Sequence, residues 1–169
     1  MLKHKNNSME AEQFLNKLAV YGTKLGVGSI QQQLNELEKL IKNLSDINHK
    51  DRNGMTYLSI AVQQYKYEVI KLLLENDADP NIEDNLGVPP LSYVFLKQTK
   101  NTEDIVKLLL QHGADPTLGR TPQHTPLYYA KFTHAPHPQI ELLEAAAANI
   151  YGGAQNQAGK EGQSQSSQS

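Results

Sequence analysis

The sequence predicts an all-α solenoid built from stacked helix-turn-helix units, and two observations support this fold class. First, a segment that begins at Asp51 returns 33 positions later at Asp84, and Leu72 returns 36 positions later at Leu108. Three residues are therefore inserted in the second copy. A period near 33 residues is typical of stacked repeats.

The second observation is that each copy follows the order turn, helix, turn, helix. Gly54 follows an Asx-rich tripeptide, which is turn chemistry, and Thr56 can cap the helix after it. Residues 69–74 form a second helix that is apolar over much of its circumference and needs cover on more than one side. Asp77 and Gly113 occupy the left-handed position after the second helices.

One such unit cannot bury its leucine face alone, so the flanks should also hold repeat-like sequence. Residues 9–48 are predicted to form an N-terminal capping helix pair, with Ser29 as the N-cap of its second helix. That helix has one apolar face at spacings of three and four: Ile30, Leu34, Leu37, Ile41 and Leu44. A coiled-coil seam is the competing interpretation, but the segment is short and leads directly into a repeat turn.

The later copies depart from the pattern. In the second repeat Pro89 replaces the capping threonine, and Asn101 or Thr102 should cap its second helix. In the third, Thr125 keeps the start of the first helix, and a run of alanines favours a helix that ends near Gly152 and Gly153. An atypical last unit is what a capping repeat requires.

The residues of the two full copies resemble the ankyrin repeat family. The family pattern is Asp-x-x-Gly-x-Thr-Pro-Leu-His, then Ala, a Leu-Leu helix, Gly-Ala-Asp and Asn. The first copy keeps Asp51, Gly54, Thr56, Leu58, Ala61, Leu72, Leu73, Ala78, Asp79 and Asn81. The second keeps Asp84, Gly87, Pro90, Leu91, Leu108, Leu109, Gly113, Ala114 and Asp115.

The resemblance implies a non-catalytic scaffold that binds a partner protein through its turn tips and the exposed positions of each first helix. Carried over residue by residue, the predicted partner-binding residues are Arg52, Asn53, Met55, Gln63, Gln64, Asn85, Leu86, Val88, Leu96, Lys97, Arg120, Gln123 and His124. The third copy departs from the pattern at Arg120 and Gln123, which stand where the opening Asp and the turn Gly are expected.

The predicted layout has six segments. They are a disordered N-terminus at 1–8, a helical cap or degenerate repeat at 9–50, a repeat at 51–83, a repeat with the insertion at 84–119, a degenerate repeat at 120–151, and a disordered Gly/Gln/Ser-rich tail at 152–169.

The amino-acid composition limits which classes of partner and which cellular location we expect for the protein. The 169 residues carry a net charge of −2, so we expect neither nucleic acid nor a membrane as a partner. No apolar run approaches a spanning helix, and no cysteine is present, which excludes thiolate catalysis and disulfides. We expect a cytoplasmic monomer, and export as an effector by a non-classical route stays open.

No catalytic, cofactor-binding or metal-binding residues are predicted. His134 and His137 resemble half of a metal site, but no third ligand is expected near them, and a solvent-exposed loop explains both. Gly26 and Gly28 lack the rest of a phosphate-binding fingerprint. No nucleophile motif surrounds any serine.

The tyrosines divide into two groups. We expect Tyr93 and Tyr129 to pack between repeats, and Tyr65 and Tyr67 to lie on the surface, where tyrosine favours protein contacts. Two other functions remain as alternatives to a binding scaffold: a structural module that joins a larger complex through its N-terminal helices, and an enzyme whose site the sequence does not reveal.

Overall fold

The computed structural model describes residues 12–23 and 28–158 of the chain. The predicted disorder of residues 1–8, Gly26, and the last part of the tail, 159–169, lie outside the described residues. Between residues 12 and 158, apart from the gap at 24–27, the structure holds helices and no strand, and the single β-bridge joins Lys50 to Thr56.

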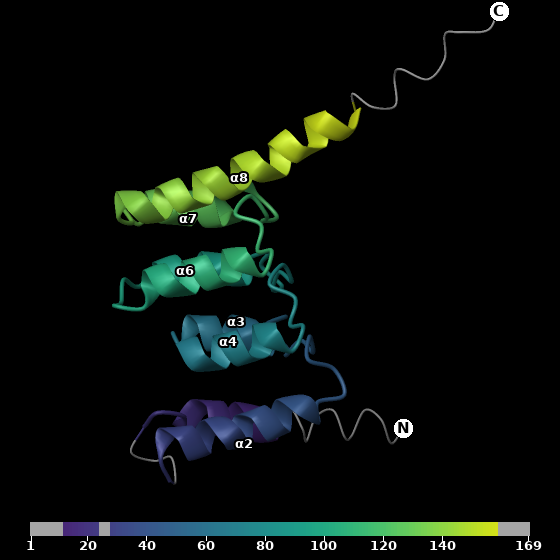
Figure 1. The fold of residues 1–169 in the computed structure, drawn as a ribbon, viewed down its shortest axis with the longest axis vertical. Helices are drawn as coiled ribbons and strands as arrows, with labels where there is room; N and C mark the ends of the chain where they lie inside the picture. The colour runs from purple at the N-terminus through teal and green to yellow at the C-terminus, as the bar shows by residue number, and fades with distance from the viewer. Residues whose placement is uncertain (1–11, 24–27, 159–169) are drawn as a thin grey trace, which may run out of the picture.

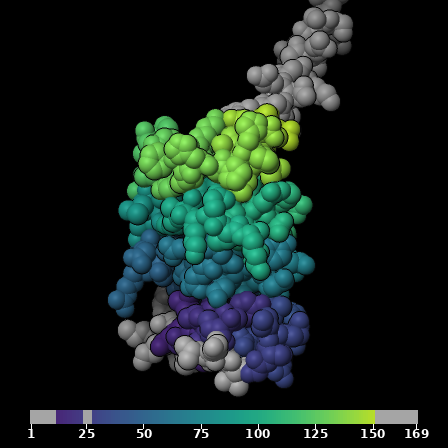
Figure 2. All heavy atoms as spheres, turned by 90° about the vertical axis from the view of Figure 1, so that its left-hand side faces the viewer, coloured from purple at the N-terminus to yellow at the C-terminus, as the bar shows by residue number. Residues whose placement is uncertain are grey.

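The helices pair into tiers that pile along one axis, as both views of the molecule show (Figures 1 and 2). The first tier pairs the helix at 12–20 with α2 (Ile30–Lys42). The next pairs α3 (Tyr57–Gln63) with α4 (Tyr67–Glu75).

In the third tier a short α5 (Pro90–Tyr93) continues as the 3₁₀ turn η1 (Val94–Leu96) and pairs with α6 (Thr102–Gln111). A second 3₁₀ turn, η2 (Pro122–His124), leads to the last pair, α7 (Pro126–Phe132) and α8 (His137–Ala158).

The tiers contact one another through two layers. The first helices α3, α5 and α7 pack in sequence to make one layer, and α2, α4, α6 and α8 make the other. Phe14 joins the first tier to the first-helix layer, because its ring lies 4.9 Å, centroid to centroid, edge-on to the ring of Tyr57. This order confirms the predicted solenoid.

The core between the tiers is apolar. Leu58 and Leu91 in the first-helix layer, and Leu73, Leu109 and Leu143 in the other, are at most 1% exposed. Truncating such a leucine to alanine costs about 2–5 kcal/mol, so each of these buried side chains contributes substantially to the stability of the stack.

Helix starts follow the predicted chemistry. Ser29 forms a capping box with Gln32 at the start of α2, and the Thr56 and Thr125 hydroxyls accept hydrogen bonds from the backbone N–H groups of Ser59 and Tyr128. For α6 the predicted position of the cap is correct, because Asn101 is the N-cap residue. Its side chain, however, makes no cap hydrogen bond.

The helix ends also match expectation at two positions. Asp77 and Gly113 adopt the left-handed conformation, with φ of 65° and 85°. Two further non-glycine residues share it in the turns between paired helices: Tyr65 at 55° and His134 at 56°, each nine positions after a capping threonine. This conformation costs an L-residue roughly 1–2 kcal/mol, so neighbouring contacts must hold these turns.

Two predictions about exposure were wrong. Tyr65 and Tyr67 are half-buried, and the Tyr65 hydroxyl donates to the carbonyls of Tyr93 and Val94 in the next tier, at 3.4 and 3.3 Å. Ile30, assigned to the apolar face of α2, is 61% exposed in the first turn of that helix, whereas the buried residues of α2, Leu37 and Ile41, lie in its second half.

The predicted tail boundary was also wrong. Helix α8 does not end at Gly152 but runs on to Ala158, past the end of α7 (Figure 1). The physical reason is propensity: glycine costs only about 1 kcal/mol relative to alanine inside a helix, and the alanines at 145–148 extend an already nucleated helix through it.

Asparagine side chains bridge successive tiers at the ends of the second helices. Asn48 Oδ1 accepts from the backbone N–H of Asp79 at 2.9 Å. Asn81 makes two such bonds, accepting from the N–H of Asp115 at 2.8 Å and donating to the carbonyl of Gly113 at 2.8 Å. These bonds set the spacing between tiers where apolar packing alone has no direction.

Substituting Asn81→Ala should lower the free energy of unfolding by about 1–3 kcal/mol, because two backbone groups lose their partners. Urea denaturation measures the change. The matched control is Asn53→Ala at an exposed asparagine, whose side chain makes no hydrogen bond in the described structure and whose loss should stay within about 0.5 kcal/mol. Equal effects of the two substitutions would contradict a bridging role.

Candidate functional site

The turn tips between tiers are closed by aspartates. Asp51 Oδ1 accepts from the backbone N–H groups of Asn53 and Met55, at 2.8 and 2.9 Å. Asp84 Oδ1 accepts from those of Leu86 and Val88 at 2.9 and 3.0 Å. Each tip is therefore an internally bonded loop whose shape does not depend on a partner.

Neighbouring tips are also bonded to one another. The Asn85 backbone N–H donates to the carbonyl of Asn53 at 2.9 Å, and its side chain donates to the carbonyl of Arg52 at 2.8 Å. Arg120 continues the series, with its N–H on the carbonyl of Gly87 at 3.1 Å and its guanidinium on the carbonyl of Asn85 at 3.0 Å. We call this bonded series, residues 51–55, 84–88 and 120, the turn edge.

The glycines of the turn edge allow this close approach. Gly54 has a φ of 78°, and a Cβ there would lie 2.6 Å from the backbone nitrogen of Asn85. Gly87 has a φ of 79°, and its Cβ would lie 2.2 Å from the Cβ of Arg120. Both positions therefore require glycine for conformation and for space.

Most of the residues predicted for the tips are accessible. Arg52, Asn53, Asn85, Leu86, Arg120 and Gln123 are exposed, while Met55 and His124 are half-buried. Leu86 stands out, since this apolar side chain is 67% exposed at a tip. Val88 has to be removed from the set: it is 4% exposed, because its backbone N–H and carbonyl both bond to Asp84 and turn its side chain into the core.

The predicted residues of the first helices are exposed at the other end of those helices. Gln63 and Gln64 lie at the end of α3, and Leu96 and Lys97 at the end of η1. Leu96 is 54% exposed.

Two residues of the third copy were missed by sequence reasoning. Phe132 is 67% exposed and Tyr128 is 40% exposed on α7, and their rings stack with centroids 5.8 Å apart and an interplanar angle of 11°. The repeat register could have predicted the exposure of Phe132, because Phe132 follows the capping Thr125 by seven residues, just as the predicted contact residue Gln63 follows Thr56. We call the exposed side chains of Gln63, Leu96, Tyr128 and Phe132 the first-helix face.

A buried hydrogen bond connects the turn edge to the first-helix layer. Asp84 is 5% exposed, and its second carboxylate oxygen accepts from the hydroxyl of Tyr93 on α5. Burial, with the hydrogen bond to Asp84 and its charge as the next causes, raises the pKa of Tyr93 well above its ordinary value. The Asp84 side chain thus connects the turn tip at 84–88 to helix α5.

The described residues offer neither a metal cluster nor a membrane-spanning helix. No group of three or more His, Asp and Glu side chains within residues 12–23 and 28–158 is placed to hold a metal ion. None of the helices in that part of the chain is both long and apolar enough to cross a bilayer.

Comparison with known proteins agrees with the fold. The family model described as "Ankyrin repeats (3 copies)" matches residues 28–120, more than half of the chain. The protein therefore belongs to the ankyrin repeat family, whose repeats are generally protein–protein interaction modules and typically non-catalytic.

Among similar proteins, an ankyrin repeat protein of Rickettsia bellii (strain RML369-C) is 35% identical over 68% of this chain and 33% of its own length. Ankyrin repeat protein L86 of Acanthamoeba polyphaga mimivirus is 38% identical over 38% of this chain and 12% of its own. The chain thus spans a third or less of these relatives.

A solved structure shares the architecture. The crystal structure of an ankyrin repeat domain from Acinetobacter baumannii AYE superposes with a TM-score of 0.62 at 26% identity, covering 77% of this chain and 63% of that domain.

The substitution Tyr93→Phe should make the free energy of unfolding fall less steeply as the pH rises into the alkaline range. Because the folded pKa of Tyr93 lies above the unfolded value of 10.0, its contribution is complete below about pH 10 and is lost as pH rises further. Urea unfolding midpoints between pH 8 and 11.5 measure the slope. Tyr21 and Tyr65, whose pKa values burial also raises, leave a residual slope.

The control for that experiment is Tyr128→Phe on the exposed surface of α7. It should leave the slope as in the parent protein. A Tyr93→Phe protein with the parent's slope would contradict the role of the Asp84 pair.

Proposed function

We propose that the protein is a non-catalytic scaffold that binds a partner polypeptide through the turn edge and the first-helix face. The observation that supports this most directly is the position of exposed apolar side chains. Of the large apolar side chains exposed in the described residues, Leu86, Leu96, Tyr128 and Phe132 lie on these two surfaces, and Ile30 and Ile150 lie on α2 and α8. Exposed apolar and aromatic side chains mark interaction sites where they gather, as the stacked rings of Tyr128 and Phe132 do on α7.

Rigidity of the turn edge supports the same proposal. Asn85 and Arg120 are each held by backbone and side-chain hydrogen bonds to the neighbouring tip. A surface that is already ordered loses little conformational entropy when it binds, which favours affinity.

The proposed contact set combines the exposed or half-buried predicted residues with the two that the structure adds. Its members are Arg52, Asn53, Met55, Gln63, Gln64, Asn85, Leu86, Leu96, Lys97, Arg120, Gln123, His124, Tyr128 and Phe132. Among these, Leu86, Leu96 and Phe132 should contribute most of the binding energy, because truncating a buried apolar anchor affects binding far more than changing a polar rim residue.

The cytoplasmic location, the monomeric state and a role as a microbial effector on host proteins stay predictions. Relatives from a bacterium and a virus are compatible with that role.

Crosslinking identifies the surface directly. A photoreactive phenylalanine placed at position 96 or 132, in the cells that express the protein, should give a covalent adduct with the same polypeptide at both positions. The same residue at Lys71 or Gln111, which are exposed on α4 and α6, should not give that adduct. Adducts of equal yield at all positions would contradict the proposed surface.

The triple substitution Leu86→Asp, Leu96→Asp and Phe132→Asp should abolish binding of the crosslinked partner while circular dichroism and the thermal midpoint stay near the parent values, because all three side chains are exposed. The matched control is Ile30→Asp with Ile150→Asp, which also places charges at exposed apolar positions, 61% and 45% exposed, but away from the proposed surface. Loss of binding in the control alone would favour assembly through the N-terminal helices instead.

A further inference from the structure

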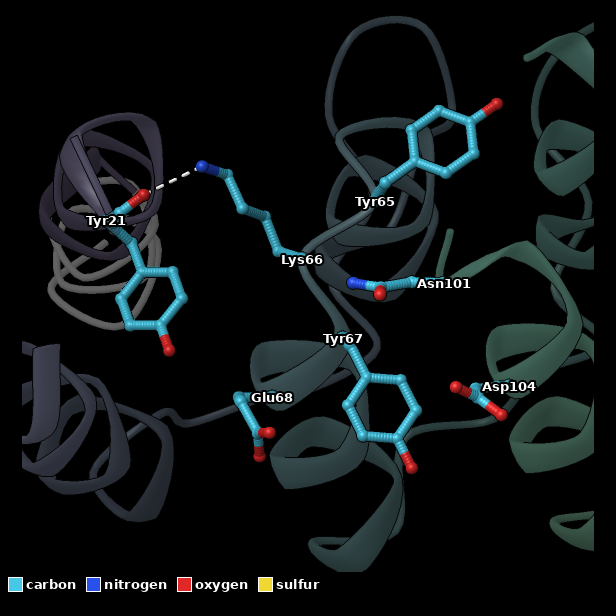
Figure 3. A pocket seen from close by; sticks show the side chains of 8 residues that line it. Tyr21, Tyr65, Lys66, Tyr67, Glu68, Asn101 and Asp104 are labelled. Carbon is cyan, nitrogen blue, oxygen red and sulfur yellow. Dashed lines mark hydrogen bonds between the residues drawn. The ribbon is translucent and has the colours of Figure 1, made fainter. Parts of the chain in front are cut away.

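A cleft of about 320 Å³ opens on the edge of the stack formed by the turns between paired helices (Figure 3). It spans three tiers: Tyr21 follows the helix at 12–20, Tyr67 and Glu68 begin α4, and Asp104 lies in the first turn of α6. Its volume is at the lower end of ligand pockets, which suits a single side chain.

Two carboxylates of the cleft have no partner. Glu68 and Asp104 are exposed, and neither makes a hydrogen bond or an ion pair within the described part of the chain. The nearby Lys107 is paired with Glu103 at 2.6 Å rather than with Asp104. Both carboxylates therefore remain available to a bound group.

An aromatic ring lies with these carboxylates. In Figure 3 the ring of Tyr67 projects between the side chains of Glu68 and Asp104. Tyr67 is half-buried, and its hydroxyl makes no hydrogen bond in the described structure. The face of a tyrosine ring attracts a cation, and a guanidinium stacks on it especially well.

The cleft already contains one cationic side chain, Lys66, and this side chain is bonded to Tyr21. Lys66 Nζ donates to the carbonyl of Tyr21 at 2.7 Å and lies 5.9 Å from the centroid of the Tyr21 ring. With one ammonium and two carboxylates, the lining carries a formal charge of 1 − 2 = −1. Burial and, second, the charge of Glu68 raise the pKa of Tyr21, so the negative field reaches that wall as well.

We propose that this cleft binds the guanidinium group of an arginine side chain presented by a polypeptide. The group stacks on Tyr67 and donates hydrogen bonds to Glu68 and Asp104, as charge-assisted bonds between guanidinium and carboxylate do. The inference rests on the proposed function, since the arginine belongs to a partner polypeptide. The cleft nevertheless shares no residue with the turn edge, so a short arginine peptide can test it separately.

An anion is the competing occupant. The N-termini of α4 and α6 open at the cleft, neither has a side-chain cap hydrogen bond, and Lys66 is cationic. Glu68 and Asp104 lie in the first turns of these helices, however, and already complement their dipoles. The remaining charge favours a cation.

Nuclear magnetic resonance of the ¹⁵N-labelled chain tests this occupant. The probe is acetyl-Gly-Arg-Gly-amide, and the control peptide carries citrulline, which has the same shape without the charge. The arginine peptide should give saturable shifts of the amides of Gly22, Tyr67 and Asn101, and these should weaken as salt rises. The citrulline peptide should bind at least about fivefold more weakly.

Variants of the cleft give effects of opposite sign. Glu68→Gln with Asp104→Asn should weaken binding of the arginine peptide by about fivefold, whereas Lys66→Met, which removes the competing cation, should strengthen it. Asp77→Asn is the control, because it removes an exposed carboxylate that lies outside the cleft and makes no ion pair in the described structure, and it should have little effect.

The proposal is overturned if the arginine peptide gives no saturable shifts, or if the citrulline peptide binds equally well. It is also overturned if inorganic phosphate produces the shifts and Lys66→Met removes them, since the cleft is then an anion site. The triple aspartate variant of the turn edge and first-helix face should bind the arginine peptide like the parent protein, so failure of this site and failure of the proposed function are distinguishable.

Discussion

Apolar contact between tiers is the interaction on which the rest of the structure depends. A pair of short helices with leucines on both sides, such as α3 and α4, has no way to bury them by itself, and neighbours above and below supply the cover. Leu73 and Leu109 are fully buried for this reason. The bridging side chain of Asn81 then adds the direction that apolar packing lacks.

This mode of assembly leaves two edges with different properties. The turn edge is tied by hydrogen bonds across tiers, through Asn85 and Arg120, and it presents a preformed surface. The opposite edge holds the turns between paired helices, where Tyr65 and His134 adopt left-handed conformations without the help of glycine. There the side chains of three tiers enclose a cleft. The turn edge and the cleft therefore lie on different edges of one stack.

The surface that we propose for partner binding could be predicted only in part from the sequence. Repeat register correctly placed Arg52 and Leu86 at exposed tips, because those positions follow directly from the turn that Asp51 or Asp84 closes. Register alone did not show that Val88 turns inward. Phe132 was missed because the third copy is degenerate around it.

By itself, the sequence determined the local features: the period of the repeat, the capping threonines and the left-handed closing residues. These depend on residues a few positions apart, so the order of amino acids contains the information. Only the tertiary structure decided which side chains stay exposed, how Tyr65 reaches the next tier, and how Glu68 comes to share a cleft with Asp104. Those outcomes depend on contacts between tiers about 33 residues apart in the chain, where small differences in packing rather than local propensity set the result.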